Sequence, residues 1–396
     1  MPISTKPKNE REAAALARAR QLTHFRWTPL RDVPTFTKEA GKTVLPAGVE
    51  VLGFPYSSTE RQDKFFAENI SFETFLTAIP NENSKLYQPG HGQFGSANYG
   101  VVCNGFVRYA FGIPYRVNTK NWFKLPGMRL IAERDQFTVN DIELLDVLHA
   151  FGYGRNHVAL VTDILRDEES GEIVEVEVSE AVRPSCLCAR YTPEKLFERF
   201  QVFSLCRYDN MDEVPLFDEE EDKLLHSGIE KVSPKIALDA GNKANYLLGE
   251  EVLVTINVEE SDTVELLCEG KLIESIQVDK RAQFPLSLGR GYYEARLQKA
   301  GEGVEFAVNA ACVKHTAENG MLTVEADPCD ENSEIVYADL RLEGDGVAGI
   351  SAFLPLTDEE RESGRFSREI PEDAVNFKVY YKNKYGVWTH PMKAIF

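Results

Sequence analysis

The chain beyond about residue 232 consists of short segments in which apolar and polar residues alternate, with Gly, Asp and Ser between them. Successive side chains of a strand point to opposite faces, so this pattern predicts short strands with one buried face. Their number and spacing favour immunoglobulin-like β-sandwiches. We therefore predict two such domains, at residues 232–318 and 319–396. Tyr292 and Phe377 stand at similar places in the two series and are predicted corner aromatics of a duplicated unit.

The chain before residue 209 mixes helical and strand patterns. Residues 10–23 are rich in Ala, Glu, Arg and Leu and predict an N-terminal helical extension. Apolar residues recur at helical spacing after Cys103, whereas residues 172–182 alternate strictly, as a half-buried strand does. We predict an α+β domain over residues 1–208. The acidic stretch at 209–231 is then a solvated linker.

Length and charge limit the possible partners. At 396 residues the chain is too long for one typical domain. The net charge of −19 opposes binding to nucleic acid or to an anionic membrane, and we predict neither partner. No apolar run is long enough to span a bilayer, and the first residues lack the apolar core of a secretory signal. The compartment stays open: cytoplasmic as the sequence stands, or cell-wall or extracellular after trimming or another export route.

The cysteines predict no disulfide framework and no metal site. Seven cysteines are scattered along the chain, and Cys186 and Cys188 form C-x-C without a second pair. No phosphate loop, dinucleotide fingerprint or zinc motif is present, so we expect no cofactor. Buried thiols are the simplest interpretation for every cysteine except Cys103.

Cys103 is the candidate nucleophile. It follows glycine-rich sequence and precedes helical periodicity that Gly112 and Pro114 end. The N–H groups and positive end of a helix lower the pKa of a thiol, and a nearby imidazolium lowers it further. The N–H of Cys103 could then donate to the oxyanion of a tetrahedral intermediate. The alternative is a structural thiol packed under the helix.

His157 is the candidate base. It begins an apolar strand 54 residues after Cys103, where its ring can face a cleft. His91, in a glycine-rich loop, is a weaker candidate. His149 ends its own apolar stretch and could equally be a satisfied core residue.

Glu180 is the candidate third member of the site. A turn at RDEESG joins the strand of His157 to the next one, and antiparallel pairing places residues 179–180 opposite His157. Glu180 is in phase with Val176 and Val178, which puts a carboxylate on the apolar face. A carboxylate there needs a partner, and it would fix the orientation and tautomer of His157. Alternatively the strand has ended and Glu180 is solvated.

Two segments resemble a known family, the NlpC-type cysteine peptidases. These are papain-like enzymes that cut peptide bonds in bacterial cell-wall stem peptides. The resemblance covers roughly residues 20–205 and implies a papain-like catalytic domain. Matching positions are Cys103, Gly105, Phe106 and Val107 in the first motif, and Asp146, Val147, Leu148, His157, Val158 and Ala159 in the second. Glu180 matches by position and resembles the Glu of the related CHAP amidases.

The sequence departs from the family beside the nucleophile. Val102 stands where the family usually has Asp, and Asn104 where it has Ser. Those neighbours help to hold substrate in the family. We assign substrate binding to five residues: Tyr56, Ser57, Ser58, Tyr99 and Asn104. An ordinary turn is an equally good interpretation of residues 56–58.

These observations predict a cysteine peptidase or amidase. It would hydrolyse an amide bond of a peptide, with peptidoglycan stem peptides or their fragments as the substrate class, through an acyl-enzyme on Cys103. The β-sandwiches would contact wall polymer, a protein partner or another subunit. One alternative is a non-catalytic wall-binding or adhesion protein that keeps a papain-like shell. Another is an acyl transferase with the same Cys–His pair.

Overall fold

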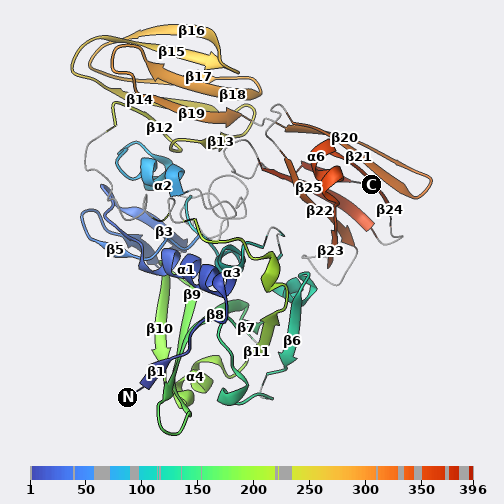
Figure 1. Ribbon diagram of the computed structural model, residues 1–396. Helices are drawn as coiled ribbons and strands as arrows, with labels where there is room; N and C mark the ends of the chain where they lie inside the picture. Colours follow the sequence, from blue (N-terminus) through green and yellow to red (C-terminus); the bar gives the residue numbers. More distant parts are fainter. Residues whose placement is uncertain are drawn as a thin grey trace.

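The fold is built from three groups of β-sheets, which Figure 1 shows at the bottom, the top and the right. The computed structural model describes residues 2–38, 41–57, 72–89, 98–113, 115, 117–134, 136–152, 154–218, 222, 234–308, 311–328, 334–342, 350–370, 374–382 and 392–395. Among these residues no helix is both long and apolar enough to cross a membrane.

The first group is dominated by a seven-stranded antiparallel sheet. Its strands follow the order β10-β9-β8-β7-β11-β6, and β1 pairs with β8. The strands are β1 (Pro2–Ser4), β6 (Met128–Ala132), β7 (Val147–Ala150), β8 (His157–Asp167), β9 (Ile173–Ala181), β10 (Cys186–Tyr191) and β11 (Ser204–Tyr208). Two small hairpin-like pairs lie beside it: β2 (Arg26–Trp27) with β5 (Val51–Leu52), and β3 (Val33–Lys38) with β4 (Gly41–Leu45).

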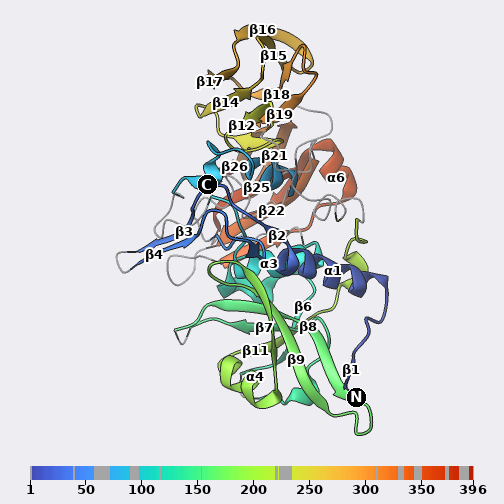
Figure 2. The ribbon, with the colours of Figure 1, turned by 90° about the vertical axis from the view of Figure 1, so that its left-hand side faces the viewer.

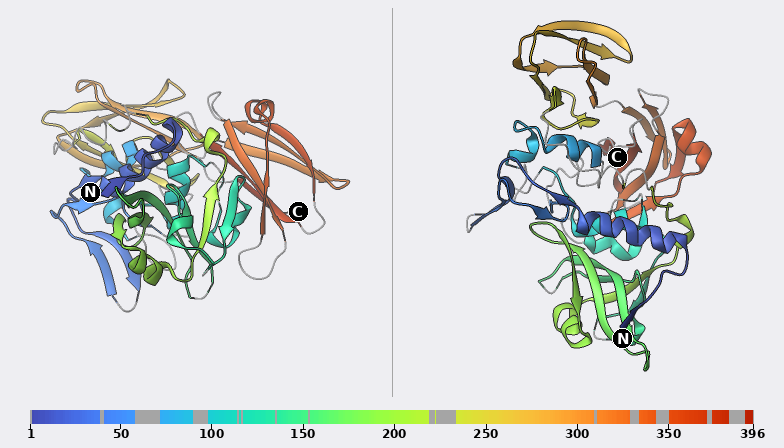
Figure 3. Two further views of the ribbon diagram at one scale, coloured as in Figure 1. Left: turned by 60° about the horizontal axis from the view of Figure 1, so that its bottom comes forward. Right: turned by 60° about the vertical axis from the view of Figure 1, so that its left-hand side comes forward.

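Short helices cover the two faces of this sheet. The predicted N-terminal helix is confirmed as α1 (Glu10–His24), which Asn9 caps through its side chain. It packs beside α3 (Cys103–Phe111) on one face, as Figure 2 and the right view of Figure 3 show. On the other face, α4 (Pro193–Phe200) buries Leu196 and Phe200. The remaining short elements are α2 (Phe72–Ala78), η1 (Lys85–Tyr87), η2 (Thr119–Lys124), η3 (Val139–Asp141) and η4 (Met211–Glu213).

The second group is an immunoglobulin-like β-sandwich. One sheet has the order β12-β14-β17 and the other β13-β19-β18-β15-β16. Alternating residues of both sheets meet in one apolar core, as the sequence pattern requires. The strands are β12 (Ile236–Leu238), β13 (Ala244–Tyr246), β14 (Glu251–Asn257), β15 (Asp262–Cys268), β16 (Lys271–Val278), β17 (Arg281–Ser287), β18 (Gly291–Leu297) and β19 (Gly303–Val308).

A tyrosine corner closes this sandwich, one residue away from the predicted position. The Tyr293 hydroxyl donates to the carbonyl of Gly289 at 3.0 Å, four residues upstream, as in immunoglobulin folds. Tyr292 is also buried, but its backbone N–H is held by Glu269 at 3.0 Å. The alternating pattern identified the strand, but it could not decide which of two adjacent tyrosines faces the corner.

The third group repeats a similar strand order in two sheets, β20-β21-β24 and β23-β22-β25-β26. Its elements are β20 (Ala311–Glu318), β21 (Met321–Pro328), β22 (Glu334–Leu342), β23 (Ile350–Leu354), α6 (Asp358–Ser363), β24 (Arg365–Glu369), β25 (Ala374–Lys382) and β26 (Met392–Ile395). Phe377 is buried in β25, but it has no hydroxyl with which to form a tyrosine corner.

The prediction of an α+β chain with a papain-like catalytic domain is wrong. More of the described residues lie in β-strands than in helices, and the immunoglobulin-like part of the prediction is the part that fits. The segments with apolar residues at helical spacing do form helices, but these helices are short. They have seven residues in α2, nine in α3 and eight in α4. An apolar stripe shows that a segment is helical, but it does not show how much of the fold is helix. The domain limits at 208, 231 and 318 stay predictions.

The predicted linker at 209–231 is mostly exposed or half-buried where it is described, but it contacts the first group at Val214 and Pro215. Val214 is fully buried, and its carbonyl accepts from Arg11 of α1. Pro215 lies so close to Gly112 that a β-carbon at that glycine would clash with the proline ring. Residues 219–221 and 223–231 lie outside the described residues.

The turn between β12 and β13 docks the sandwich onto the first group. The backbone N–H of Lys85 donates to the Asp239 carbonyl at 2.6 Å, and Lys85 Nζ lies 3.2 Å from the Asp239 carboxylate. The Tyr246 hydroxyl donates to the same carboxylate at 2.6 Å. The Tyr99 hydroxyl donates to the Ala240 carbonyl at 2.7 Å. This contact therefore reaches a residue only four positions before Cys103.

Replacing Asp239 by Ala tests the importance of this contact. The change removes a buried carboxylate from Lys85 and Tyr246, so we expect the free energy of unfolding to fall by about 3 kcal/mol. Urea unfolding of the full chain measures the change. The control is Glu265→Ala, which breaks the more exposed Glu265–Arg296 pair on the same sandwich and should cost about 1 kcal/mol or less. Equal losses in the two variants would contradict the docking role.

Candidate functional site

Cys103 is the first residue of α3. Val102 precedes the helix in an extended conformation, without a side-chain cap, and Gly112 ends it in the left-handed conformation. The backbone N–H groups of Asn104 and Val158 hydrogen-bond to the Cys103 sulfur. The residue is 7% exposed and packs into the core between α3 and the sheet. Its sulfur thus lies at the amide-rich end of a helix in a poorly hydrated place.

The surroundings of Cys103 lower the pKa of its thiol. Burial, the largest influence, raises the pKa because it disfavours the thiolate. A hydrogen bond from His157, the charge of that ring and the two backbone N–H groups act in the opposite direction. Together they outweigh burial. The neighbourhood therefore makes ionisation of this thiol easier than that of an ordinary cysteine.

His157 is the first residue of β8 and connects Cys103 to Glu180. Its Nε2 lies 2.5 Å from Oε2 of Glu180, which leaves Nδ1 for the sulfur. Phe203 packs edge-on against the ring, with centroids 6.2 Å apart. Burial lowers the pKa of His157, but hydrogen bonds and charges of Cys103 and Glu180 raise it to about 9. This pKa favours the imidazolium at neutral pH, and the ring lies between Cys103 and Glu180.

Glu180 lies in β9 on the apolar face, in phase with Val176 and Val178 as the alternation indicates. Its carboxylate is 4% exposed. The register differs slightly from the predicted one. Ser179 pairs with Leu160 rather than with His157, and the β8–β9 ladder shifts by one residue between Val161 and Asp163. The carboxylate reaches His157 diagonally rather than from directly across.

Arg199 is the member of this group that sequence reasoning missed. It lies in the last turn of α4, and its Nη2 is 3.4 Å from each oxygen of Glu180. The only signal in the sequence was a basic residue near a helix end. Nothing local relates α4 to β9, since their contact depends on how the helix packs on the sheet.

The other histidines of the first half lie elsewhere. His149 Nε2 is 2.8 Å from the Thr119 carbonyl, and burial lowers the pKa of this histidine. Its ring meets Phe123 edge-on. His149 is thus a satisfied core residue, one of the two interpretations left open. His91 lies outside the described residues.

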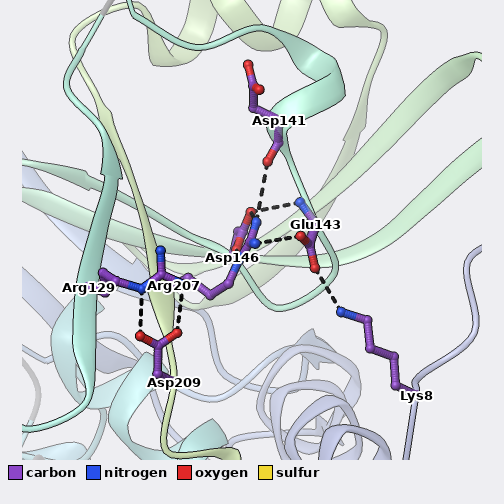
Figure 4. Close-up of polar contacts among 7 residues, drawn as sticks. All are labelled: Lys8, Arg129, Asp141, Glu143, Asp146, Arg207 and Asp209. Carbon is purple, nitrogen blue, oxygen red and sulfur yellow. Dashed lines mark hydrogen bonds and ion pairs between the residues drawn. The ribbon is translucent and has the colours of Figure 1, made fainter.

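Asp146, which matched the second motif, belongs to a separate ion-pair network, shown in Figure 4. The side chain is fully buried, and Arg207 holds it through two bonds of 2.7 and 2.9 Å. Its carboxylate also accepts from the backbone N–H of Glu143 at 2.7 Å, and Glu143 pairs with Lys8. Burial raises the pKa of Asp146 despite these bonds. The network ties the N-terminal segment to the start of β7 and does not include Cys103 or His157.

Four of the five predicted substrate residues are described, and each of these four is buried or makes contacts within the protein. Tyr56 bridges to Val101 in the segment before Cys103. Ser57 and Tyr99 are fully buried. The Asn104 amide donates to the Val117 carbonyl at 2.5 Å and so holds the chain after α3. Ser58 lies outside the described residues. Substrate binding by these five positions stays a prediction.

The described residues contain no group of three His, Cys, Asp or Glu side chains placed to hold a metal ion. Five described cysteines are free: Cys103, Cys186, Cys188, Cys206 and Cys268. Burial raises the pKa of Cys186 and Cys206, which sets both apart from Cys103. One hollow of about 490 Å³ lies between residues 80–83 and the β14–β17 sheet, away from Cys103.

Comparison with known proteins places the chain in no family. No protein-family model and no curated protein matches it. The NIE–MG1 segment of native alpha-2-macroglobulin from Escherichia coli is 15% identical over 41% of this chain and 97% of that structure, with a TM-score of 0.17. The fibronectin(III)-like modules of Clostridium thermocellum CbhA are 15% identical over 40% and 90%, with a TM-score of 0.15. At these TM-scores the likenesses carry no argument about fold or function.

The pairing of Cys103 with His157 predicts a distinctive alkylation profile. Because His157 lowers the pKa of the thiol, iodoacetamide should modify Cys103 well below the pH range of an ordinary thiol. In His157→Ala burial then dominates, and the rate at pH 7 should fall at least about tenfold. Mass spectrometry of the peptide that carries Cys103 measures the rate. Cys188, whose pKa burial raises, is the internal control and should react equally slowly in both proteins. An unchanged rate at Cys103 in the variant would contradict the pairing.

Proposed function

We propose that this chain is a cysteine-dependent amidase or peptidase. The observation that carries the proposal is the buried series of Cys103, His157 and Glu180, in which the pKa of the thiol is lowered and that of the ring is raised to about 9. A thiolate is the nucleophile of such enzymes, and the neighbouring imidazolium donates a proton to the leaving group. Perturbed pKa values of this kind concentrate at functional sites.

The geometry supports a two-step hydrolysis without a cofactor. The Cys103 thiolate attacks the carbonyl carbon of the amide, and His157 gives its proton to the leaving amine as the C–N bond breaks. His157 then takes a proton from water, which attacks the thioester and releases the carboxylic acid and the thiolate. The N–H of Cys103, in the first turn of α3, has no acceptor within the helix and can stabilise the oxyanion.

The proposed substrate class is the peptide of peptidoglycan stems. It is supported by the motif around Cys103 and by His157-Val158-Ala159, both similar to those of the NlpC-type peptidases. The two departures from that motif have structural roles in this chain. Val102 precedes the helix in an extended conformation, and Asn104 holds the Val117 carbonyl.

A non-catalytic binding protein is the second candidate. The observation in its favour is the 7% exposure of Cys103, which limits the access of a substrate carbonyl to the sulfur. Such a protein would bind muropeptides without cleaving them.

Replacing Cys103 by Ala tests the proposal. We expect hydrolysis of purified muropeptides to fall by at least about 10³-fold, because removal of a nucleophile leaves only binding and the oxyanion site. Chromatography and mass spectrometry of the products measure turnover. The matched control is Cys188→Ala, which should keep the parent rate.

Three outcomes separate the candidates. Loss of turnover in Cys103→Ala alone supports hydrolysis. Parent turnover in Cys103→Ala contradicts the mechanism. Muropeptide binding without turnover in the parent protein supports the non-catalytic candidate.

A further inference from the structure

Behind the proposed site lies a fourth charged side chain, that of Arg199. Its Nη2 lies 3.4 Å from Oε1 and 3.4 Å from Oε2 of Glu180, while Oε2 also meets the His157 ring at 2.5 Å. Glu180 is almost fully buried, and the Arg199 side chain is 33% exposed. Arg199 therefore contacts both oxygens of the carboxylate that binds the imidazole, and it shares Oε2 with the ring.

The charges of the site explain why a cation is needed there. A thiolate on Cys103, an imidazolium on His157 and a carboxylate on Glu180 sum to one net negative charge in a poorly hydrated place. Burying an unbalanced charge is costly, and the guanidinium of Arg199 brings the sum to zero. A carboxylate bonded only at Oε2 could also rotate away from the ring, whereas contacts to both oxygens restrain it.

Arg199 is itself held in place by groups from several elements. Its guanidinium carbon lies 4.8 Å from the ring centroid of Phe200. Burial raises the pKa of the Tyr191 hydroxyl of β10, and the guanidinium is close enough to that hydroxyl to lower this pKa in part. From the loop after β7, Arg155 donates to the Arg199 carbonyl at 3.2 Å. Among the described residues, the titratable and charged groups around His157 and Arg199 come from four elements. They are Cys103 from α3, Glu180 from β9, Tyr191 from β10 and Arg155 from the loop after β7.

We propose that Arg199 is a positioning residue that holds the Glu180 carboxylate against Nε2 of His157 and so keeps the imidazole directed at Cys103. Arg199 acts through Glu180 and does not touch the reacting atoms. This inference deepens the proposed function and rests on it for its biological meaning. The arrangement itself can be tested without any turnover.

The test is the titration of His157 by NMR of labelled histidine rings, assigned with His157→Gln. Loss of the Arg199 charge alone would favour the imidazolium and move the titration to higher pH. Displacement of the Glu180 carboxylate from the ring would instead disfavour the imidazolium and move the titration of His157 to lower pH. We therefore expect Arg199→Gln to lower the titration midpoint of His157 by at least about one pH unit, from the value near 9.

Three further variants make the result decisive. Arg199→Lys keeps the positive charge, so the titration midpoint of His157 in this variant should lie close to that of the parent protein. Arg155→Gln is the matched control, since it leaves Glu180 untouched, and should not move it. Because Arg199 lowers the midpoint only through Glu180, the double variant Arg199→Gln/Glu180→Gln should titrate at or slightly above the midpoint of Glu180→Gln and not below it. Circular dichroism shows whether each variant is folded.

The outcomes separate this inference from the proposed function. An unchanged or raised midpoint in Arg199→Gln, or additive effects in the double variant, overturns the positioning role. A lowered midpoint supports it even where the parent protein fails to hydrolyse muropeptides, a result that counts against the proposed function alone.

Discussion

The pairing of the Cys103 sulfur with the His157 ring is the interaction on which the rest of the site depends. A sulfur anion in a poorly hydrated place is unstable alone, but two opposite charges about 4 Å apart gain roughly 4 kcal/mol at an effective dielectric constant near 20. The first turn of α3, the first residue of β8 and the carboxylate of β9 all contribute to that pair. The seven-stranded sheet brings these three elements together although they are far apart in the sequence.

The first sandwich belongs to the same packed structure as this site. Asp239 and Ala240 in the β12–β13 turn bind Lys85 and Tyr99, and Tyr99 leads within four residues to Cys103. A domain joined only by a solvated tether would make no such contacts. The sandwich therefore supports the segment before the nucleophile, in addition to any binding that its exposed strands perform.

Local patterns in the sequence predicted local features well. Residues rich in Ala, Glu, Arg and Leu predicted α1, and period-two alternation placed Glu180 on the face of Val176 and Val178. Features that depend on packing were missed. The shift in the β8–β9 ladder, the docking of α4 that brings Arg199 to Glu180, and the burial of Ser57 follow from contacts between distant segments. The papain-like class failed for the same reason, because short helices and two motifs do not report how much of the chain forms sheets.

The central claim is that His157 and the start of α3 lower the pKa of Cys103 below that of an ordinary thiol, and its ultraviolet absorbance tests this directly. The difference spectrum between the parent protein and Cys103→Ser, followed from acid to alkaline pH, isolates this one sulfur. The account predicts a thiolate band that develops at lower pH than the band of an ordinary thiol. A band that develops only in the alkaline range of an ordinary thiol would contradict the account.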